Sequence, residues 1–283
     1  MRRELRAGVT LIELLVSMVL LLIVIAIGAV TAQRTVAVQA RLSALTARRD
    51  GISDALRTLT RHAAGVDPAA GDLLAARDSV VELLHTIGIA TVCRSGGDTL
   101  VLEHAADSLP WAGTLPRAVT GDDELRVWDD GAGRWMRRRI VAVGSAGGAC
   151  GDGVTPWPGR AVQRLLIDSA VDQLRPGSLV RVLQRERWSL IRSGDGSWSL
   201  SLATWDAARR AYDASQPLLS SLAAPSAPGG RGFTVRALDR VGATLIDSAA
   251  LRRARALLFT VRSASHSRYG TTIDSVRVNV GAH

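Results

Sequence analysis

Residues 9–33 read VTLIELLVSMVLLLIVIAIGAVTAQ, an apolar run that contains one charged residue, Glu13. There is no charge between Leu14 and Gln33, and about 20 residues of α-helix extend for about 30 Å. This length matches the hydrocarbon core of a bilayer. A carboxylate inside such a run is costly, and a functional role is the usual explanation. The run therefore predicts a membrane-spanning helix whose single acid has a purpose.

The start of this run, Gly8 to Leu15 (GVTLIELL), resembles the processing site of type IV prepilins and type II secretion pseudopilins. The resemblance implies that a prepilin peptidase cuts between Gly8 and Val9 and methylates the new amino group of Val9. Glu13 then becomes the fifth residue of the mature chain. Val9 departs from the family pattern, which most often has Phe or Met at this position.

Elementary electrostatics also gives Glu13 a role. Cleavage after Gly8 would leave an amino cation at Val9, four residues from Glu13. In a filament, the amine of one subunit could neutralise the carboxylate of its neighbour among apolar side chains. Breaking a buried pair costs about 3–5 kcal/mol because one charge is left unpaired. Such a pair would fix the register between subunits.

Two simpler kinds of N-terminus remain as alternatives. An ordinary secretory signal would use Arg2, Arg3 and Arg6 as its basic start, and a plain membrane anchor would hold Glu13 at the interface. The apolar run, however, is longer than the roughly 7–15 residues typical of a secretory signal. Neither alternative gives the carboxylate a purpose, so the prepilin-type interpretation is favoured.

The apolar pattern continues past the run on one face of a helix. The positions that recur at steps of three, four and seven are Val38, Leu42, Leu45, Ile52, Leu56 and Leu59. No proline occurs before Pro68. The pattern predicts one helix from about Thr10 to about His62, roughly 80 Å long, apolar all round in its first half and amphipathic in its second half.

Beyond the helix, short β-prone segments separated by turn residues predict an antiparallel sheet. Strands are expected at 80–85, 87–93, 99–103, 124–128, 135–143, 233–238, 257–263 and 275–280. The most distinct hairpin joins 178–192 to 198–204, where Trp188 and Leu190 alternate opposite Trp198, Leu200 and Leu202. Proline and glycine predict a loop at 217–232, and 247–256 reads as a short helix or turn.

These features predict an α+β protein in which a long N-terminal helix packs on an antiparallel β-sheet head. The expected divisions are a leader at 1–8, a transmembrane and assembly helix at 9–33, its amphipathic extension at 34–62, and a head at 63–283. The closing segments LRRARALLFTVRSAS and SVRVNVG (251–265 and 275–281) resemble the end of large minor subunits of the PilW and GspJ kind. That resemblance implies a strand pair beneath the helix.

The chain carries a net charge of +9, and every one of its 35 basic residues is an arginine. A basic exterior can attract nucleic acid or anionic lipid. The arginines are scattered, however, and the run Arg137–Arg139 has no clustered aromatic residues beside it. A solvated face is therefore favoured, and nucleic acid is a weaker alternative partner.

Cys93 and Cys150 are the two cysteines of the chain. Both would lie outside the cytoplasm in this topology, where an even count of cysteines indicates one disulfide. Two separate thiols are the alternative, because the sequence cannot show that they meet.

The motifs of catalysis and metal binding are missing from the sequence, so we expect no enzyme, no cofactor and no metal. The five histidines, His62, His85, His104, His266 and His283, lack paired-ligand spacing. The acidic groups at 122–124 and 129–130 lack the spacing of a calcium loop, and turn chemistry explains Asp129 and Asp130 equally well.

The resemblance thus implies a structural subunit, most like a minor pilin that primes or caps a filament. Its partners would be prepilin peptidase, other pilin or pseudopilin subunits, the inner-membrane assembly platform and the lipid bilayer. It would cross the bacterial inner membrane once, with the head in the periplasm, and then enter a filament. A type II secretion pseudopilin of a periplasmic piston, and a pilin head that binds DNA or surfaces, remain alternatives.

Overall fold

The computed structural model describes residues 11–105, 119–129, 131, 133–145, 160–171, 174–264 and 271–281. Its one α-helix within these ranges, α1, spans Leu11–Ala64. The long helix predicted from the apolar pattern is confirmed over this range, because neither proline nor a break in the pattern interrupts it. Thr10, where the helix was expected to begin, lies outside the described residues.

The chain divides into two compact units, Met1–Asp50 and Gly51–His283, and α1 contributes to both. We call residues 11–50 of α1 the exposed segment and residues 51–64 the docked segment. The docked segment buries Ile52, Ala55, Leu56, Leu59 and Ala63 in the second unit. The predicted apolar stripe is therefore buried in its C-terminal part only.

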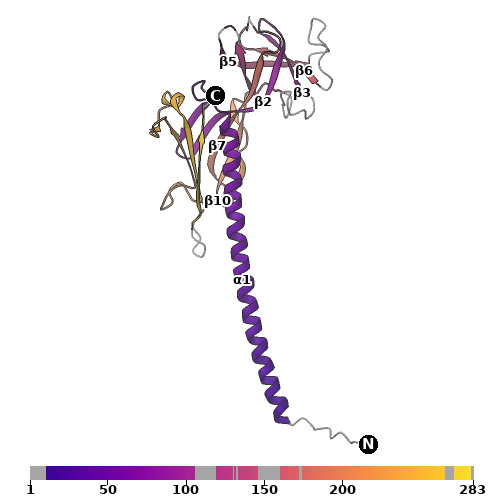
Figure 1. The fold of residues 1–283 in the computed structure, drawn as a ribbon, viewed down its shortest axis with the longest axis vertical. Helices are drawn as coiled ribbons and strands as arrows, with labels where there is room; N and C mark the ends of the chain where they lie inside the picture. Colours follow the sequence, from indigo (N-terminus) through magenta and orange to yellow (C-terminus); the bar gives the residue numbers. More distant parts are fainter. Residues whose placement is uncertain are drawn as a thin grey trace, which may run out of the picture. The chain divides into compact units, whose positions relative to one another are not determined.

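The larger sheet of the second unit is antiparallel (Figure 1). Its strands are β1 (Leu73–Arg77), β2 (Val80–Gly96), β3 (Thr99–Ala105), β4 (Asp123–Asp129), β5 (Arg134–Ser145), β6 (Arg160–Ile167), β7 (Leu179–Arg192), β8 (Trp198–Asp206), β9 (Ala211–Tyr212) and β10 (Gln216–Leu222). They follow the order β1-β2-β3-β6-β5-β4-β7-β8-β10, with β9 paired to β8.

The two longest strands, β2 and β7, have places in the strand order above and also pair directly with each other. β2 also pairs with β7 from Val80 opposite Ser189 to Thr91 opposite Leu179, and this closes β2-β3-β6-β5-β4-β7 into a ring. Leu100, Leu125, Leu165 and Val182 are fully buried inside one apolar cluster of the ring. Ring closure leaves these six strands without a free edge there, which protects them from pairing with other chains.

A smaller antiparallel sheet has the order β12-β11-β13-β14. Its strands are β11 (Phe233–Leu238), β12 (Thr244–Leu245), β13 (Ala256–Arg262) and β14 (Ile273–Asn279), and a short 3-10 helix spans Ala250–Arg253. Phe233, Phe259 and Val278 share one apolar cluster with Leu59 of the docked segment and Trp188 of β7. The docked segment is therefore held by residues of both sheets.

The predicted α+β class and antiparallel sheet are confirmed. The predicted hairpin is β7–β8, with Trp188 opposite Leu202 and Leu190 opposite Leu200. The loop predicted at 217–232 is wrong in its first part, because β10 continues to Leu222. Pro217 is tolerated there because β10 stands at the end of the strand order, where a missing N–H donor breaks no ladder.

Candidate functional site

The exposed segment has a large apolar surface that is open to solvent in the described structure. Its large apolar side chains between Leu11 and Leu42 are exposed, from 49% at Ile23 to 81% at Leu11. Among the described residues, one helix, α1, is long and apolar enough to cross a membrane. Folded chains rarely leave so large an apolar surface to water, so this surface marks a contact with a membrane or a partner.

Glu13 lies in the first turn of α1. A negative charge at this end of a helix is favoured by the helix dipole. The next polar side chain, Ser17, turns back onto the helix, where its hydroxyl donates to the carbonyl oxygens of Glu13 and Leu14 at 2.8 and 3.0 Å. The hydrogen-bond donor of the Ser17 side chain is thus satisfied within the helix. The predicted processing residues Gly8 and Val9 lie outside the described residues.

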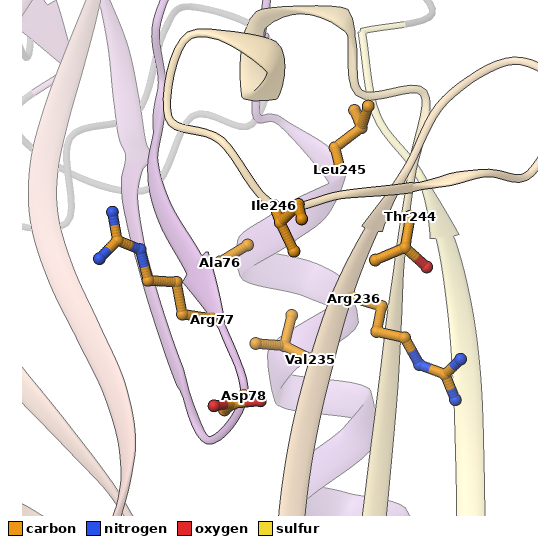
Figure 2. Close-up of a pocket in the computed structure, with 8 residues that line it drawn as sticks. All are labelled: Ala76, Arg77, Asp78, Val235, Arg236, Thr244, Leu245 and Ile246. Carbon is orange, nitrogen blue, oxygen red and sulfur yellow. The ribbon is translucent and has the colours of Figure 1, made fainter.

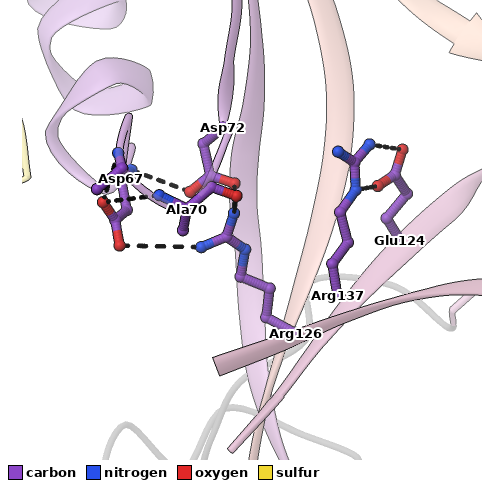
Figure 3. Close-up of polar contacts among 7 residues, drawn as sticks. Asp67, Ala70, Asp72, Glu124, Arg126 and Arg137 are labelled. Carbon is purple, nitrogen blue, oxygen red and sulfur yellow. Dashed lines mark hydrogen bonds and ion pairs between the residues drawn. The ribbon is translucent and has the colours of Figure 1, made fainter. Parts of the chain in front are cut away.

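Just beyond the docked segment, a buried ion pair fastens the chain to β4. We call Asp67, Ala70, Asp72 and Arg126 the anchor network (Figure 3). Arg126 Nη2 lies 2.5 Å from Asp72 Oδ1 and donates to the carbonyl oxygen of Ala70 at 2.7 Å. The second carboxylate oxygen of Asp72 accepts the backbone N–H of Asp67 at 2.9 Å. The side chains of Arg126 and Asp72 are each only 2% exposed.

Burial dominates the electrostatics of this pair. It raises the pKa of Asp72 to about 6, although the nearby Arg126 charge pulls in the opposite direction. It also lowers the pKa of Arg126 below its ordinary value, despite the attraction of Asp72. Asp72 Oδ1 and Arg126 Nε both lack a well-aligned hydrogen bond. The pair is therefore close in distance but incompletely compensated for leaving water.

A second charged network lies where β2 pairs with β7. Arg185 and Arg187 donate to the carboxylate of Glu82 at 3.0 and 2.8 Å, and the Tyr212 hydroxyl donates to it at 2.8 Å. Burial alone would raise the pKa of Glu82, but these hydrogen bonds outweigh it and hold the pKa below its usual range. The network ties β2, β7 and β9 together on one face of the sheet.

The opposite face of the same strand pair carries a group that we call the histidine cluster: His62, His85 and Glu186. His62 Nδ1 lies 2.7 Å from Glu186 Oε2, and His85 Nδ1 lies 3.2 Å from Glu186 Oε1. An ionised carboxylate only accepts hydrogen bonds, so both Nδ1 atoms donate. The two imidazoles stack with ring centroids 4.0 Å apart. Beneath them, the buried Trp188 directs its indole N–H at Glu186 Oε2, 3.4 Å away.

The cluster joins three elements, because His62 lies in the last turn of the docked segment, His85 lies on β2 and Glu186 lies on β7. Burial of Glu186 would by itself raise its pKa, but the hydrogen bonds and charges of His62 and His85 lower that pKa to about 2. The ligand atoms of the three residues lie within 4.8 Å of one another, a spacing that could hold a metal ion. Sequence spacing missed the cluster because its members are far apart along the chain.

In the second unit, a groove of about 450 Å³ lies between β1 and the β11–β12 pair (Figure 2). Its lining consists of Ala76, Arg77, Asp78, Val235, Arg236, Thr244, Leu245 and Ile246. Asp78 is the one carboxylate of this lining, and Arg231 pairs with it at 2.8 Å. No acid–base pair and no nucleophile with a base is present among these lining residues.

The other residues singled out in the sequence have structural partners. Arg137 forms an ion pair with Glu124, so one member of the arginine run is engaged within the sheet (Figure 3). Asp129 accepts the backbone N–H of Gly131 at 2.9 Å, as turn chemistry predicts. Cys93 is nearly buried and contributes to a small cluster with Val101. Cys150 lies outside the described residues, so the disulfide stays a prediction.

Comparison with known proteins gives one finding. The model of the prokaryotic N-terminal methylation motif matches residues 5–29, which cover the predicted processing site, Glu13 and much of the apolar run. No curated protein and no solved structure matches the chain. The matched motif, together with the apolar helix, supports a type IV pilin or pseudopilin.

Proposed function

We propose that this chain is a minor pilin or pseudopilin, a structural subunit cut between Gly8 and Val9, methylated on Val9 and assembled through the exposed segment. The observation that carries the proposal is that the methylation motif coincides with an apolar helix whose surface is uncovered. A single acid, Glu13, lies at the start of that helix. An amine on Val9 of a neighbouring subunit would neutralise it.

In this proposal, the protein waits in the inner membrane with its head, residues 63–283, in the periplasm. Neighbouring subunits then cover the exposed segment as the filament grows. The large head, built from two sheets, supports a priming or capping role at the tip, because it offers more surface than a repeated shaft subunit needs. Arg126, Arg137, Arg185 and Arg187 pair with carboxylates of their own chain. This favours a structural role over nucleic-acid binding.

The test is incorporation of a Glu13→Ala variant into filaments. We expect the variant to remain in the membrane and to be processed, yet to enter filaments at least about tenfold less, because a buried amine would lose its counter-charge. Leu22→Ala, at an uncharged position of the same segment, serves as the matched control and should enter filaments far more than Glu13→Ala does, because it leaves no charge unpaired. Normal incorporation of Glu13→Ala would contradict the proposed pairing.

A disulfide between Cys93 and Cys150 belongs to the same proposal. The two residues are 57 positions apart in the sequence. Closing a loop of that size stabilises a fold by about 4 kcal/mol in the chain-entropy model. We expect neither thiol to react with an alkylating reagent until a reductant is added. Alkylation of both cysteines in the unreduced, unfolded protein would show that the bond is not formed.

A further inference from the structure

The histidine cluster has the ligand types, the spacing and the burial of a metal site. We propose that His62, His85 and Glu186 bind one Zn²⁺ ion and that this ion fastens the docked segment to β2 and β7. The inference goes beyond the proposed filament function and does not depend on it, since it concerns how the second unit is held together.

The distances already approach those of a coordinated ion. Zn²⁺ bonds to histidine nitrogen and carboxylate oxygen are about 2.0–2.2 Å long, which places tetrahedral ligand atoms about 3.3 Å apart. In the cluster, Nδ1 of His62 and Nδ1 of His85 lie 2.7 and 3.2 Å from oxygens of Glu186. Binding therefore exchanges two N–H···O hydrogen bonds for two N–Zn bonds. Each imidazole holds the ion through Nδ1 as a neutral ring with one proton on Nε2, and any second proton is released to solvent.

One ring has to turn when the ion binds. The imidazole planes are nearly parallel, at 12° to each other, whereas a metal ion lies in the plane of each imidazole that holds it. The second torsion angle of a histidine side chain is broad and inexpensive to change. The His62 and His85 side chains are 17% and 18% exposed, so their outer edges meet solvent. The same opening lets an ion enter and lets water provide a fourth ligand.

The donor set favours Zn²⁺ over Ca²⁺ and Mg²⁺. Two imidazoles and one carboxylate form a ligand set that Zn²⁺ accepts in proteins, with an open fourth position. Ca²⁺ and Mg²⁺ prefer oxygen ligands alone. Trp188 supports the site from below, because its indole N–H contacts Glu186 Oε2 and helps to fix the carboxylate.

The test uses the full chain, purified in detergent without a histidine tag and stripped with EDTA. Calorimetric titration with ZnCl₂ at pH 7.5 should show one ion per chain, and the thermal unfolding midpoint should rise with zinc and fall again with EDTA. CaCl₂ and MgCl₂ should leave the midpoint unchanged. Co²⁺, as a probe, should give the visible absorption of a four-coordinate site.

His62→Gln and His85→Gln should each weaken zinc binding by at least about tenfold and abolish the zinc-dependent rise in the midpoint. Glu82→Gln is the matched control, because Glu82 lies on the opposite face of the same strand pair and is bound by arginines. It should lower the midpoint without zinc but keep the rise on adding zinc. Absence of binding in the native chain, or binding that survives both histidine substitutions, would overturn the proposal.

Discussion

The two segments of α1 share one helix but differ in what covers them. Leu22 in the exposed segment is 65% exposed, whereas Leu59 in the docked segment is fully buried. The sequence around Leu59 alternates apolar and polar faces, and the sequence around Leu22 is apolar on every side. The docked segment thus completes the core of its own chain. The exposed segment carries an apolar surface that suits contact with a membrane or a partner.

The largest effect on stability that the comparison predicts comes from the anchor network next to the docked segment. Arg126→Met should lower the free energy of unfolding at pH 7 by about 3–5 kcal/mol, because it leaves Asp72 buried without its partner. The pKa of Asp72, about 6 in the folded chain, is above its ordinary value. Asp72 therefore favours folding below pH 4, and this contribution is lost as the pH rises through 6.

The loss in Arg126→Met should accordingly be smaller at pH 5 than at pH 7, because a lone buried carboxyl takes up a proton at the lower pH. Denaturant unfolding at the two pH values measures this difference. Arg209→Met, which removes exposed ion pairs to Asp206 and Asp213, is the control and should leave stability nearly unchanged. An equal loss at both pH values would show that Asp72 does not titrate as described.

The same leucine-to-alanine substitution, made once in each segment, tests the difference in burial between them. Leu59→Ala should cost about 2–5 kcal/mol, since it opens a cavity in the cluster shared with Phe259 and Trp188. Denaturant unfolding of the second unit in detergent, followed by tryptophan fluorescence, measures the loss.

A smaller effect is expected at Glu82. Glu82→Gln should cost about 1.5–3 kcal/mol at pH 7, because hydrogen bonds from two arginines to a charged group are weakened. The folded-state pKa of Glu82 is lowered, so its contribution is present above the ordinary pKa near 4.5 and is lost as the pH falls below it. The free energy of unfolding, measured from pH 6 to pH 3, should change less with pH in the variant than in the native chain. Asp195→Asn, in an exposed turn, is the control.

The smallest effect belongs to the exposed segment. Leu22→Ala should leave the unfolding of the second unit within about 0.5 kcal/mol of the native chain, because no residue of the described chain buries that side chain. The measurement is the one used for Leu59→Ala. A loss comparable to that of Leu59→Ala would contradict the difference in burial between the two segments.

The sequence predicted what depends on local pattern. The apolar period predicted the helix, and the alternation of Trp188 and Leu190 predicted the β7–β8 hairpin. Its register, with Trp188 opposite Leu202, comes from the structure. The strands β1 and β6 were missed, since Leu73–Arg77 is short and Arg160–Ile167 carries little alternation of apolar and polar residues. β10 was hidden by Pro217, which marks a loop except at a sheet edge.

Local sequence patterns could not predict which distant segments of the chain pair with one another. The ring depends on β2 meeting β7, and that same pairing brings His85 close to Glu186, 101 positions later in the chain. Asp72 and Arg126 likewise meet only in the folded chain, and nothing in their own neighbourhoods distinguishes them from solvated charges. The processing motif was readable because its residues are consecutive and are matched by an apolar run in register.

The most direct test of the account is the mass of the N-terminal peptide of the protein isolated from membranes or filaments. If the exposed segment is built for assembly, the peptide begins at Val9 and its mass includes one extra methyl group on the amine. In the proposed filament, this amine lies within hydrogen-bonding reach of a neighbour's Glu13. A native chain that begins at Met1, or at Gln33 after removal of the apolar run, would contradict the account.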